Sequence, residues 1–543
     1  MSEIAASDGT GRRAERARRP LPPLLVLAAG AVAIVLALPL LYLGLRATEA
    51  TAQSWDLILR MRTVWLTVRT LGLAVAVTAA TGLLGVTAAW LVVRTDLPLR
   101  RAWAVLFALP LVFPSYVGAF ALLSALGPRG LAQQLLAGPF GVDRLPDIGG
   151  FPGAFLALTL FTYPYVYLTT AAAIRGLDPT LEESARMLGH DRWRVFRRVT
   201  LPLLRPAIAA GGLLVALYTL HDFGAVSLMR YQTFTQAIFL QYRAAFDRTP
   251  AAILSLMLVG LALIVLVMEQ RARGRARYYR SGPGALRRLR PAPLGRWRLP
   301  ALAFSGVLVS LALILPVAVL VYWLVRGLDA GTPLNLTLGA AGNSILVSGG
   351  GALVAFAMAV PVAILAGRFP GRLARGIERV SYAGYALPGL VVALSLVFFA
   401  ANYTPAIYQS LPLVIGAYVV LFLPQVSEPL RGAMLQIDPS LEDAARTLGL
   451  SRGGVLRRVV LPLAARPAFA GIALVFLTAM KELPATLLLR PTGFETLATR
   501  IWTGASAGLY SRAAAPALLL LAISAVPLFL LAGRIEVEEV RTG

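Results

Sequence analysis

Residues 178–206 read DPTLEESARMLGHDRWRVFRRVTLPLLRP, and residues 438–467 read DPSLEDAARTLGLSRGGVLRRVVLPLAARP. Each copy is polar and rich in arginine, and each interrupts a chain that otherwise consists mostly of long apolar runs. The same polar segment therefore occurs twice in one mostly apolar chain. A segment that is present in two copies indicates a partner that also has two equivalent binding sites.

The composition of the chain is that of a protein that crosses a membrane many times. Of its 543 residues, 58% are hydrophobic and 14% are charged, whereas about 25% of a soluble domain is charged. Apolar runs of roughly 20 residues recur, and each is long enough to cross the hydrocarbon of a bilayer as a helix. The net charge of +25 does not indicate a nucleic-acid partner, because the arginines gather in alternate loops, as the positive-inside rule requires.

The apolar runs predict an all-α polytopic membrane protein of about twelve transmembrane helices, six in each half of the chain. An even number of spans gives both halves the same orientation, so they are expected to be parallel repeats. The predicted spans lie near residues 21–46, 64–93, 102–126, 151–175, 206–228, 250–269, 299–326, 343–367, 379–401, 405–428, 467–489 and 513–533.

The same pattern divides the chain into five segments. These are a cytoplasmic N-terminal tail, a first transmembrane domain, a basic cytoplasmic linker, a second transmembrane domain and a cytoplasmic C-terminal tail, at residues 1–20, 21–270, 271–298, 299–533 and 534–543. The first apolar run is longer than the 7 to 15 residues of a signal-peptide core. We therefore expect it to be retained as the first span.

The composition excludes several kinds of reactive site. The chain has no cysteine and only two histidines, His190 and His221, so it forms neither a thiolate site nor a histidine-rich metal site. Lys481 is the only lysine, and its surroundings, LTAMKELPATL, lack the glycines of a phosphate-binding P-loop. We predict that the chain is not an enzyme, that it binds no cofactor, and that energy for any pumping comes from another chain.

Each copy of the repeated segment reads as helix, turn, helix. Asp178-Pro179 and Asp438-Pro439 supply an N-cap followed by proline at the first helical position. Apolar residues then recur on one face and a glycine follows. These residues are Leu181, Ala185, Leu188 and Gly189, then Leu441, Ala445, Leu448 and Gly449.

A second short helix is predicted to end at Leu201-Pro202 in one copy and at Leu461-Pro462 in the other. Such a hairpin at the cytoplasmic surface either lies along the membrane as an amphipathic linker or fits the groove of a partner. Its presence in two equivalent loops favours the partner.

With these residues the chain resembles the permease subunits of binding-protein-dependent ABC importers. The signature of that family is Glu-Ala-Ala, three residues, Gly, an apolar residue seven positions on, and Leu-Pro. The first copy reads Glu183-Ser184-Ala185, Gly189, Phe196 and Leu201-Pro202, and the second reads Asp443-Ala444-Ala445, Gly449, Leu456 and Leu461-Pro462.

The resemblance implies a fold like that of a type I ABC importer permease, in which each copy forms a coupling helix. It implies that Glu183 and Asp443 contact two copies of a P-loop ATPase subunit, which hold ATP and Mg²⁺. It also implies a separate substrate-binding protein and a place in the bacterial inner membrane. Because Asp443 is one methylene shorter than glutamate and Ser184 replaces alanine, we expect the two halves to contribute unequally.

A single chain that holds both halves resembles the importers of ferric iron, thiamine and related cargoes. Residues 221–239, HDFGAVSLMRYQTFTQAIF, and residues 481–502, KELPATLLLRPTGFETLATRIW, look most like the iron(III) permeases. The resemblance therefore implies ferric iron as the cargo. Thiamine, polyamine, phosphonate and molybdate stay open as alternatives.

Four ionisable residues fall within the predicted fifth and eleventh spans: His221, Asp222, Lys481 and Glu482. Ionisable residues inside a bilayer commonly face a pathway, so we take them as candidates for a substrate path or gate. The alternative is that they only fix packing through an ion pair or hydrogen bond. Carboxylates suit a hard metal ion, but so few do not make a selective site. We therefore assign no metal ligand and expect an external binding protein to recognise the cargo.

Prolines and one long loop are further expected features of the path. Pro110, Pro114 and Pro388 are predicted to break or bend their spans, because each removes a helical hydrogen bond. Ala108-Leu109-Pro110 is expected to match Ala386-Leu387-Pro388 in the repeat. The loop at residues 127–150 is a candidate docking surface for the binding protein.

Two other classes of protein fit part of the pattern. Twelve spans in two parallel halves also describe the major facilitator transporters, but the loop VRTDLPLRR between the second and third spans lacks the glycine-rich basic signature of that family. A channel or scaffold needs no ATPase. Neither class gives the paired hairpins a purpose.

Overall fold

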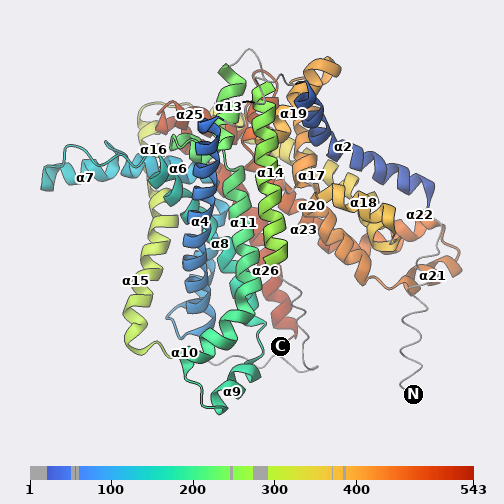
Figure 1. Ribbon diagram of the computed structural model, residues 1–543, viewed down its shortest axis with the longest axis horizontal. Coiled ribbons are helices and arrows are strands. Elements are labelled where there is room, and N and C mark those ends of the chain that lie inside the picture. Colours follow the sequence, from blue (N-terminus) through green and yellow to red (C-terminus); the bar gives the residue numbers. More distant parts are fainter. Residues whose placement is uncertain are drawn as a thin grey trace. The chain divides into compact units, whose positions relative to one another are not determined.

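The computed structural model (Figure 1) describes residues 21–49, 56, 60–244, 249–272, 291–369, 371–382, 384 and 387–542. Within these residues the regular structure is helical, apart from one isolated β-bridge between Thr95 and Ala292. The predicted tail 1–20, most of the linker 271–298 and Ala386 lie outside the described residues. The all-α fold class is confirmed.

The apolar helices agree with the prediction of about twelve spans. Nine described helices are long and apolar enough to cross a membrane, one pair forms a bent span, and two shorter apolar helices, Gly389–Tyr403 and Tyr510–Val526, complete the set. The nine are α2 (Pro23–Thr48), α4 (Met61–Arg94), α8 (Phe151–Arg175), α11 (Leu201–His221), α14 (Thr249–Ala272), α15 (Arg298–Val309) continued by α16 (Leu315–Asp329), α17 (Asn335–Arg368), α20 (Leu411–Gln436) and α23 (Leu461–Met480).

Proline breaks the third and ninth spans, as predicted. The elements concerned are α5 (Arg100–Ala108), η1 (Leu109–Val112), α6 (Ser115–Leu126), α7 (Leu131–Phe140) and α19 (Gly389–Tyr403). The chain bends by 97° between η1 and α6. Pro114 is the N-cap of α6 and Pro388 the N-cap of α19, both with extended backbone, whereas Pro110 lies inside η1. The expected match of Pro110 with Pro388 is therefore wrong, because Pro114 holds the equivalent place.

The fifth and eleventh spans end earlier than predicted. α11 ends at His221 and α23 at Met480, whereas the predicted spans continued to residues 228 and 489. The elements that follow are α12 (Gly224–Leu228), α13 (Phe234–Ala244), α24 (Pro484–Leu489) and α25 (Leu497–Ser506). The helices stop because the side chains of Asp222 and Glu482 take over amides that would otherwise be part of the helix.

Glycines allow the same close packing of helices in both halves. A Cβ at Gly211 of α11 would lie 2.7 Å from Val166 Cα of α8, and a Cβ at Gly471 of α23 would lie 2.8 Å from Val426 Cα of α20. Small residues at such contacts let membrane helices approach each other. In Figure 1, α4, α8, α11 and α14 run side by side.

Contacts divide the chain into two compact units. The first-repeat unit comprises Ala50–Thr332 and Ile501–Leu518, and the second-repeat unit comprises Met1–Glu49, Pro333–Arg500 and Leu519–Gly543. Each unit therefore contains the first span of the other half. The domain boundaries predicted at residues 21–270 and 299–533 stay a prediction about the sequence repeat, since packing follows this different division.

Specific contacts hold each exchanged span. In the second-repeat unit, α2 packs on α17, α19 and α18 (Arg372–Ser381), and Asn402 Nδ2 donates a hydrogen bond to Tyr42 Oη at 3.1 Å. In the first-repeat unit, α16 packs on α6, and Trp323 Nε1 donates to Ser124 Oγ at 2.5 Å.

Candidate functional site

The repeated segments form the same hairpin, one in each unit. Their first helices are α9 (Pro179–Met187) and α21 (Pro439–Thr447). Asp178 Oδ1 accepts hydrogen bonds from the Thr180 backbone N–H at 3.0 Å and from the Thr180 hydroxyl at 2.8 Å, and these bonds lower the pKa of the Asp178 carboxyl. Asp438 accepts from the Ser440 N–H at 2.9 Å. The predicted caps, followed by proline in the first turn, are confirmed.

A glycine in the left-handed conformation ends both α9 and α21. The φ angle is +82° at Gly189 and +85° at Gly449, and a Cβ at either position would meet no atom within 4 Å. The Gly189 N–H bonds to Arg186 O at 2.9 Å and the His190 N–H to Ala185 O at 3.2 Å, and the second copy repeats both bonds. Glycine is therefore needed for its backbone conformation and not for space.

The second helix of each hairpin continues into the following span. Its elements are α10 (Arg192–Val195) and the π-helical turn η2 (Phe196–Thr200), then α22 (Arg452–Val455) and the π-helical turn η7 (Leu456–Val460). The Leu201 N–H bonds to Phe196 O, five residues back, which widens the turn before Pro202. The predicted helix ends at Leu201-Pro202 and Leu461-Pro462 are wrong. Proline is tolerated in the first turn of a helix, so Pro202 and Pro462 begin α11 and α23 instead.

The turn of each hairpin exposes apolar side chains. Leu188 is 79% exposed and Leu448 is 84% exposed, whereas Ala185 and Ala445 are buried. The predicted apolar face is thus divided, with the alanines packed inward and the leucines pointing out.

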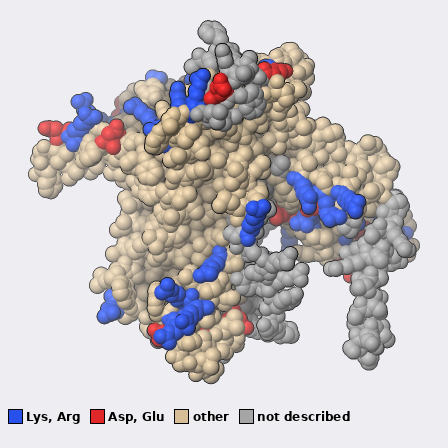
Figure 2. All heavy atoms as spheres, viewed as in Figure 1, with Lys and Arg blue, Asp and Glu red and all other residues tan. Residues whose placement is uncertain are grey.

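Polar and basic groups surround this exposed turn. The side chains of Glu183 and Asp443 are exposed, and Asp443 lies 3.3 Å from Arg446. Figure 2 shows basic side chains gathered over α9 and α10. Exposed arginines there are Arg186, Arg194, Arg197 and Arg198. An exposed apolar tip with a charged rim has the composition of a docking surface.

Behind each hairpin lies a buried ion pair that the sequence reasoning missed. Glu182 pairs with Arg94 at the end of α4, and Glu442 pairs with Arg368 at the end of α17, at 2.5 Å. The four side chains are between 9% and 14% exposed. The duplication carried a signal for this pair, because both copies have a glutamate just before the signature position and both second spans end in arginine.

Asp222 and Glu482 accept hydrogen bonds from first-turn amides of the short helices after the two breaks. Asp222 Oδ1 accepts hydrogen bonds from the Ala225 N–H at 2.9 Å and the Val226 N–H at 3.2 Å. Glu482 Oε1 accepts from the Ala485 N–H at 3.1 Å. These bonds give both carboxylates a local role in ending one helix and starting the next.

Each carboxylate also reaches the broken span beside it. Asp222 accepts a hydrogen bond from the hydroxyl of Ser115, the first residue of α6. Glu482 lies against Gly389, the first residue of α19, where a Cβ would clash with the carboxylate. In each unit one acidic residue therefore links the break in one span to the break in another.

Among the described residues, the neighbouring His221 and Lys481 form no cluster of metal ligands with them. His221 Nε2 is buried and has no hydrogen-bond partner among the described residues, and Lys481 is the C-cap of α23. Over the described ranges, no three histidine, cysteine, aspartate or glutamate side chains come together in a way that could hold a metal ion. The role of these residues in a path or gate stays a prediction.

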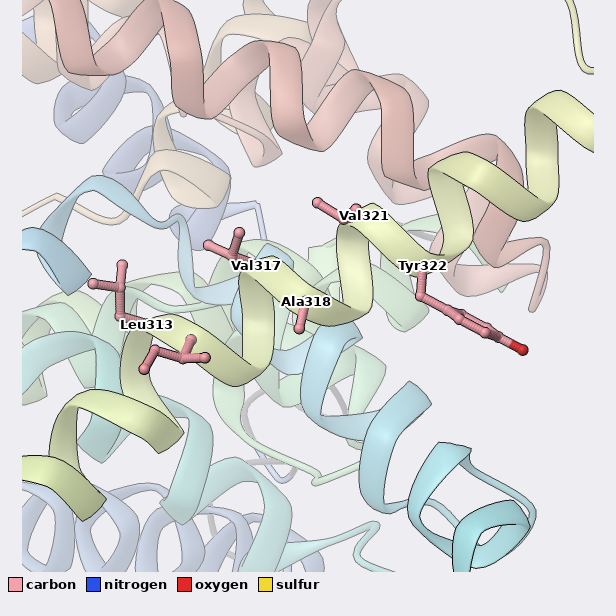
Figure 3. Close-up of a pocket in the computed structure, with 6 residues that line it drawn as sticks. Leu313, Val317, Ala318, Val321 and Tyr322 are labelled. Atoms are coloured by element: carbon pink, nitrogen blue, oxygen red, sulfur yellow. The ribbon is translucent and has the colours of Figure 1, made fainter.

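One apolar pocket lies on the first-repeat unit. Figure 3 shows its lining side chains on the π-helical turn η4 (Ser310–Ile314) and on α16. They are Leu313, Ile314, Val317, Ala318, Val321 and Tyr322, of which Tyr322 alone carries a polar group. This lining suits hydrocarbon, and it offers no set of ligands for a cation.

Comparison with known proteins places both halves in one family. The model of the binding-protein-dependent transport system inner membrane component matches twice, over residues 81–278 and 359–535. The Fe(3+)-transport system permease protein FbpB 2 of Haemophilus influenzae is 35% identical over 519 residues, which cover 95% of this chain and 98% of the relative.

Other relatives match less of the chain. The probable ABC transporter permease protein y4fN of Sinorhizobium fredii is 29% identical over 445 residues, which cover 75% of this chain and 76% of the relative. The molybdenum transport system permease protein ModB of Escherichia coli is 32% identical over 192 residues, which cover 34% of this chain and 82% of the relative.

Proposed function

This chain belongs to the family of binding-protein-dependent transport system inner membrane components, and we propose that it is the permease subunit of an ATP-driven importer of ferric iron. Membership of the family and the apolar helices make it a multi-pass inner-membrane protein. Two copies of a P-loop ATPase subunit and a substrate-binding protein are its partners in this proposal. The chain itself binds no cofactor, and ATP and Mg²⁺ belong to the ATPase subunits.

One observation carries the proposal for the ATPase partner. The hairpin occurs once in each unit, with the same cap, the same left-handed glycine and the same exposed leucine. Leu188 and Leu448 fit a cleft of the partner, and Glu183 and Asp443 contact its rim. One hairpin for each ATPase subunit accounts for the duplication.

Transport then proceeds by alternating access. ATP draws the two ATPase subunits together, and the hairpins carry this movement through η2 and η7 into α11 and α23, which they enter without a break. Because α11 and α23 end at the breaks that contain Asp222 and Glu482, movement of these spans reaches the residues predicted to form the path or gate. The path then opens toward the binding protein.

Ferric iron is the cargo that the relatives favour. FbpB 2, whose name gives Fe(3+) transport, matches this chain along nearly its whole length. Since few carboxylates are available along the predicted path, the external binding protein is expected to select the metal and the permease to let it pass. Molybdate is the second candidate, because the molybdenum permease ModB matches 34% of the chain.

The arginines support one orientation of the chain in the membrane. Both hairpins carry exposed arginines, and the positive-inside rule supports a cytoplasmic position for them. The N- and C-terminal tails then also lie in the cytoplasm. A reporter domain that is active only in the cytoplasm should be active when it is fused to either terminus. A reporter that is active only outside the cytoplasm should be inactive there.

Purification and reconstitution test the proposal. The tagged permease should retain a P-loop ATPase at two ATPase chains per permease, and the complex in vesicles should take up iron(III) only with ATP and a loaded binding protein. Uptake driven by a proton gradient without ATP would contradict the ATPase assignment. Uptake of molybdate but not iron(III) would leave the importer in place and change only the cargo.

A further inference from the structure

A buried glutamate connects each coupling helix to the end of a membrane span. Glu182 and Glu442 lie in the first turns of α9 and α21, and their arginine partners are the last residues of α4 and α17. Arg186 and Arg446, on the coupling helices themselves, lie 3.9 Å and 3.8 Å from the same carboxylates.

Burial makes these pairs unlike ordinary surface ion pairs. A surface pair is loosely held and contributes little, whereas a buried pair must be well placed to offset the loss of hydration. Replacing such a pair by apolar residues is often neutral for stability, so its presence in both copies is better explained by the position that it fixes. Here it fixes the coupling helix against a span.

The two glutamates are attached differently. Glu182 Oε1 also accepts a hydrogen bond from the Thr200 hydroxyl at 2.8 Å, and Thr200 ends the π-helical turn that leads into α11. In the second copy Val460 occupies this place and has no hydroxyl. There Arg368 Nη1 instead donates to Ile437 O at 3.0 Å, just before the coupling helix.

We propose that Glu182 and Glu442, with Arg94 and Arg368, are positioning residues that pass movement of the coupling helices to the membrane spans. Glu182 passes it to α4 and to α11, and Glu442 passes it to α17 alone. Glu183 and Asp443, the exposed signature residues, face the partner, while the residue before each of them faces the permease. This inference rests on the proposed function, because it assumes that an ATPase moves the hairpins.

The test measures cargo taken up per ATP hydrolysed by the whole complex in vesicles, with iron(III) and its binding protein. Glu182→Gln and Glu442→Gln should keep the ATPase bound and hydrolysing ATP, while uptake per ATP falls by about tenfold. The exchange of Arg94→Glu with Glu182→Arg should restore most of the uptake. Arg431→Gln is the control, because Arg431 Nε pairs at 3.1 Å with Oε1 of Glu378 in α18, and not with a residue of a coupling helix.

A cross-link provides a second measurement that does not depend on a buried lone charge. The chain has no cysteine, so Arg94→Cys with Glu182→Cys introduces the only two thiols. Joining them with a short bifunctional reagent should raise uptake per ATP above that of the same variant without reagent, because it replaces the lost attachment.

The outcomes separate this inference from the proposed function. Unchanged uptake per ATP in both glutamine variants, or a cross-link that lowers it, overturns the inference and leaves the importer in place. A wild-type complex without ATP-dependent uptake overturns the proposed function itself. A loss in Arg431→Gln equal to that in Glu442→Gln also overturns the inference, because any lost ion pair would then have the same effect.

Discussion

The first hairpin, at residues 178–202, and the second, at residues 438–462, share a backbone but are fastened differently. Both have an aspartate cap, a left-handed glycine, a π-helical turn and a buried glutamate paired with arginine. In the first, Phe196 meets Trp90 of α4 edge-on with ring centroids 4.9 Å apart, and it stacks on Trp193 at 5.7 Å.

The second hairpin lacks the residues that make these attachments. Gly453, Leu456 and Val460 stand where the first hairpin has Trp193, Phe196 and Thr200. Duplication has thus kept the shape that a partner must recognise and changed how firmly that shape is joined to the membrane body. We expect the first hairpin to be the stiffer of the two.

The largest expected effect tests what the hairpins share. Gly189→Val and Gly449→Val each force a branched residue into the left-handed region, at a cost of about 2 kcal/mol or more. Each variant should lose the bound ATPase subunit, and uptake should fall by at least about tenfold, since 1.4 kcal/mol corresponds to that factor. Co-purification and vesicle uptake measure both.

Asparagine provides the control, because it tolerates the left-handed conformation. Gly189→Asn and Gly449→Asn should keep most of the activity. If a valine variant retains both the bound ATPase and uptake, the glycine turn is not part of the docking surface. The backbone shape that the two hairpins share is then not required for binding the partner.

The next effect tests the attachment at Thr200. Thr200→Val removes a hydrogen bond to a buried carboxylate and should lower the free energy of unfolding by about 1.5 kcal/mol. Val460→Thr adds a hydroxyl to the second hairpin and should raise the uptake per ATP of the complex. Thermal unfolding measures the first change, and uptake per ATP measures the second. If neither variant differs from the wild-type protein, the Thr200 hydroxyl does not distinguish the two hairpins.

The aromatic contact comes third. Phe196→Leu copies the second hairpin into the first and should cost about 1 kcal/mol beyond the lost buried area. Leu456→Phe should gain nothing, because Gly453 offers no ring to stack on. Hydrogen exchange of α9 should become faster in the first variant only, and a slower exchange of α21 in the second variant would contradict this explanation.

The caps should show the smallest effect and no difference between copies. Asp178→Ala and Asp438→Ala should each lower uptake by less than about threefold. Because its hydrogen bonds lower the pKa of the Asp178 carboxyl, this cap stabilises the helix above the ordinary pKa of aspartate and loses its effect as the pH falls through the lowered pKa. Asp178→Asn should show no such loss when helix stability is measured over a series of pH values. If the variant loses as much stability at low pH as the wild-type protein, the pH dependence belongs to another group.

Local chemistry made much of this molecule predictable. Hydropathy gave the spans, and Asp178, Gly189 and their counterparts gave the hairpin, because caps and left-handed turns depend on a few adjacent residues. The pair of Glu182 with Arg94 joins residues 88 positions apart, so no local pattern shows it, and only a comparison of the two copies points to it. The early end of α11 was missed because hydropathy does not show that Asp222 bonds its own following amides.

The exchange of first spans bears on how the protein is made. α2 leaves the ribosome before the helices that it packs on, the first of which begins at Asn335. At about 5 to 20 residues per second, this interval lasts roughly 15 to 60 s. During that time α2 has no partner from its own unit, so the membrane or an insertion factor must shelter it. If only the first half were synthesised, α2 would lack the helices of its own unit, and α6 would lack α16.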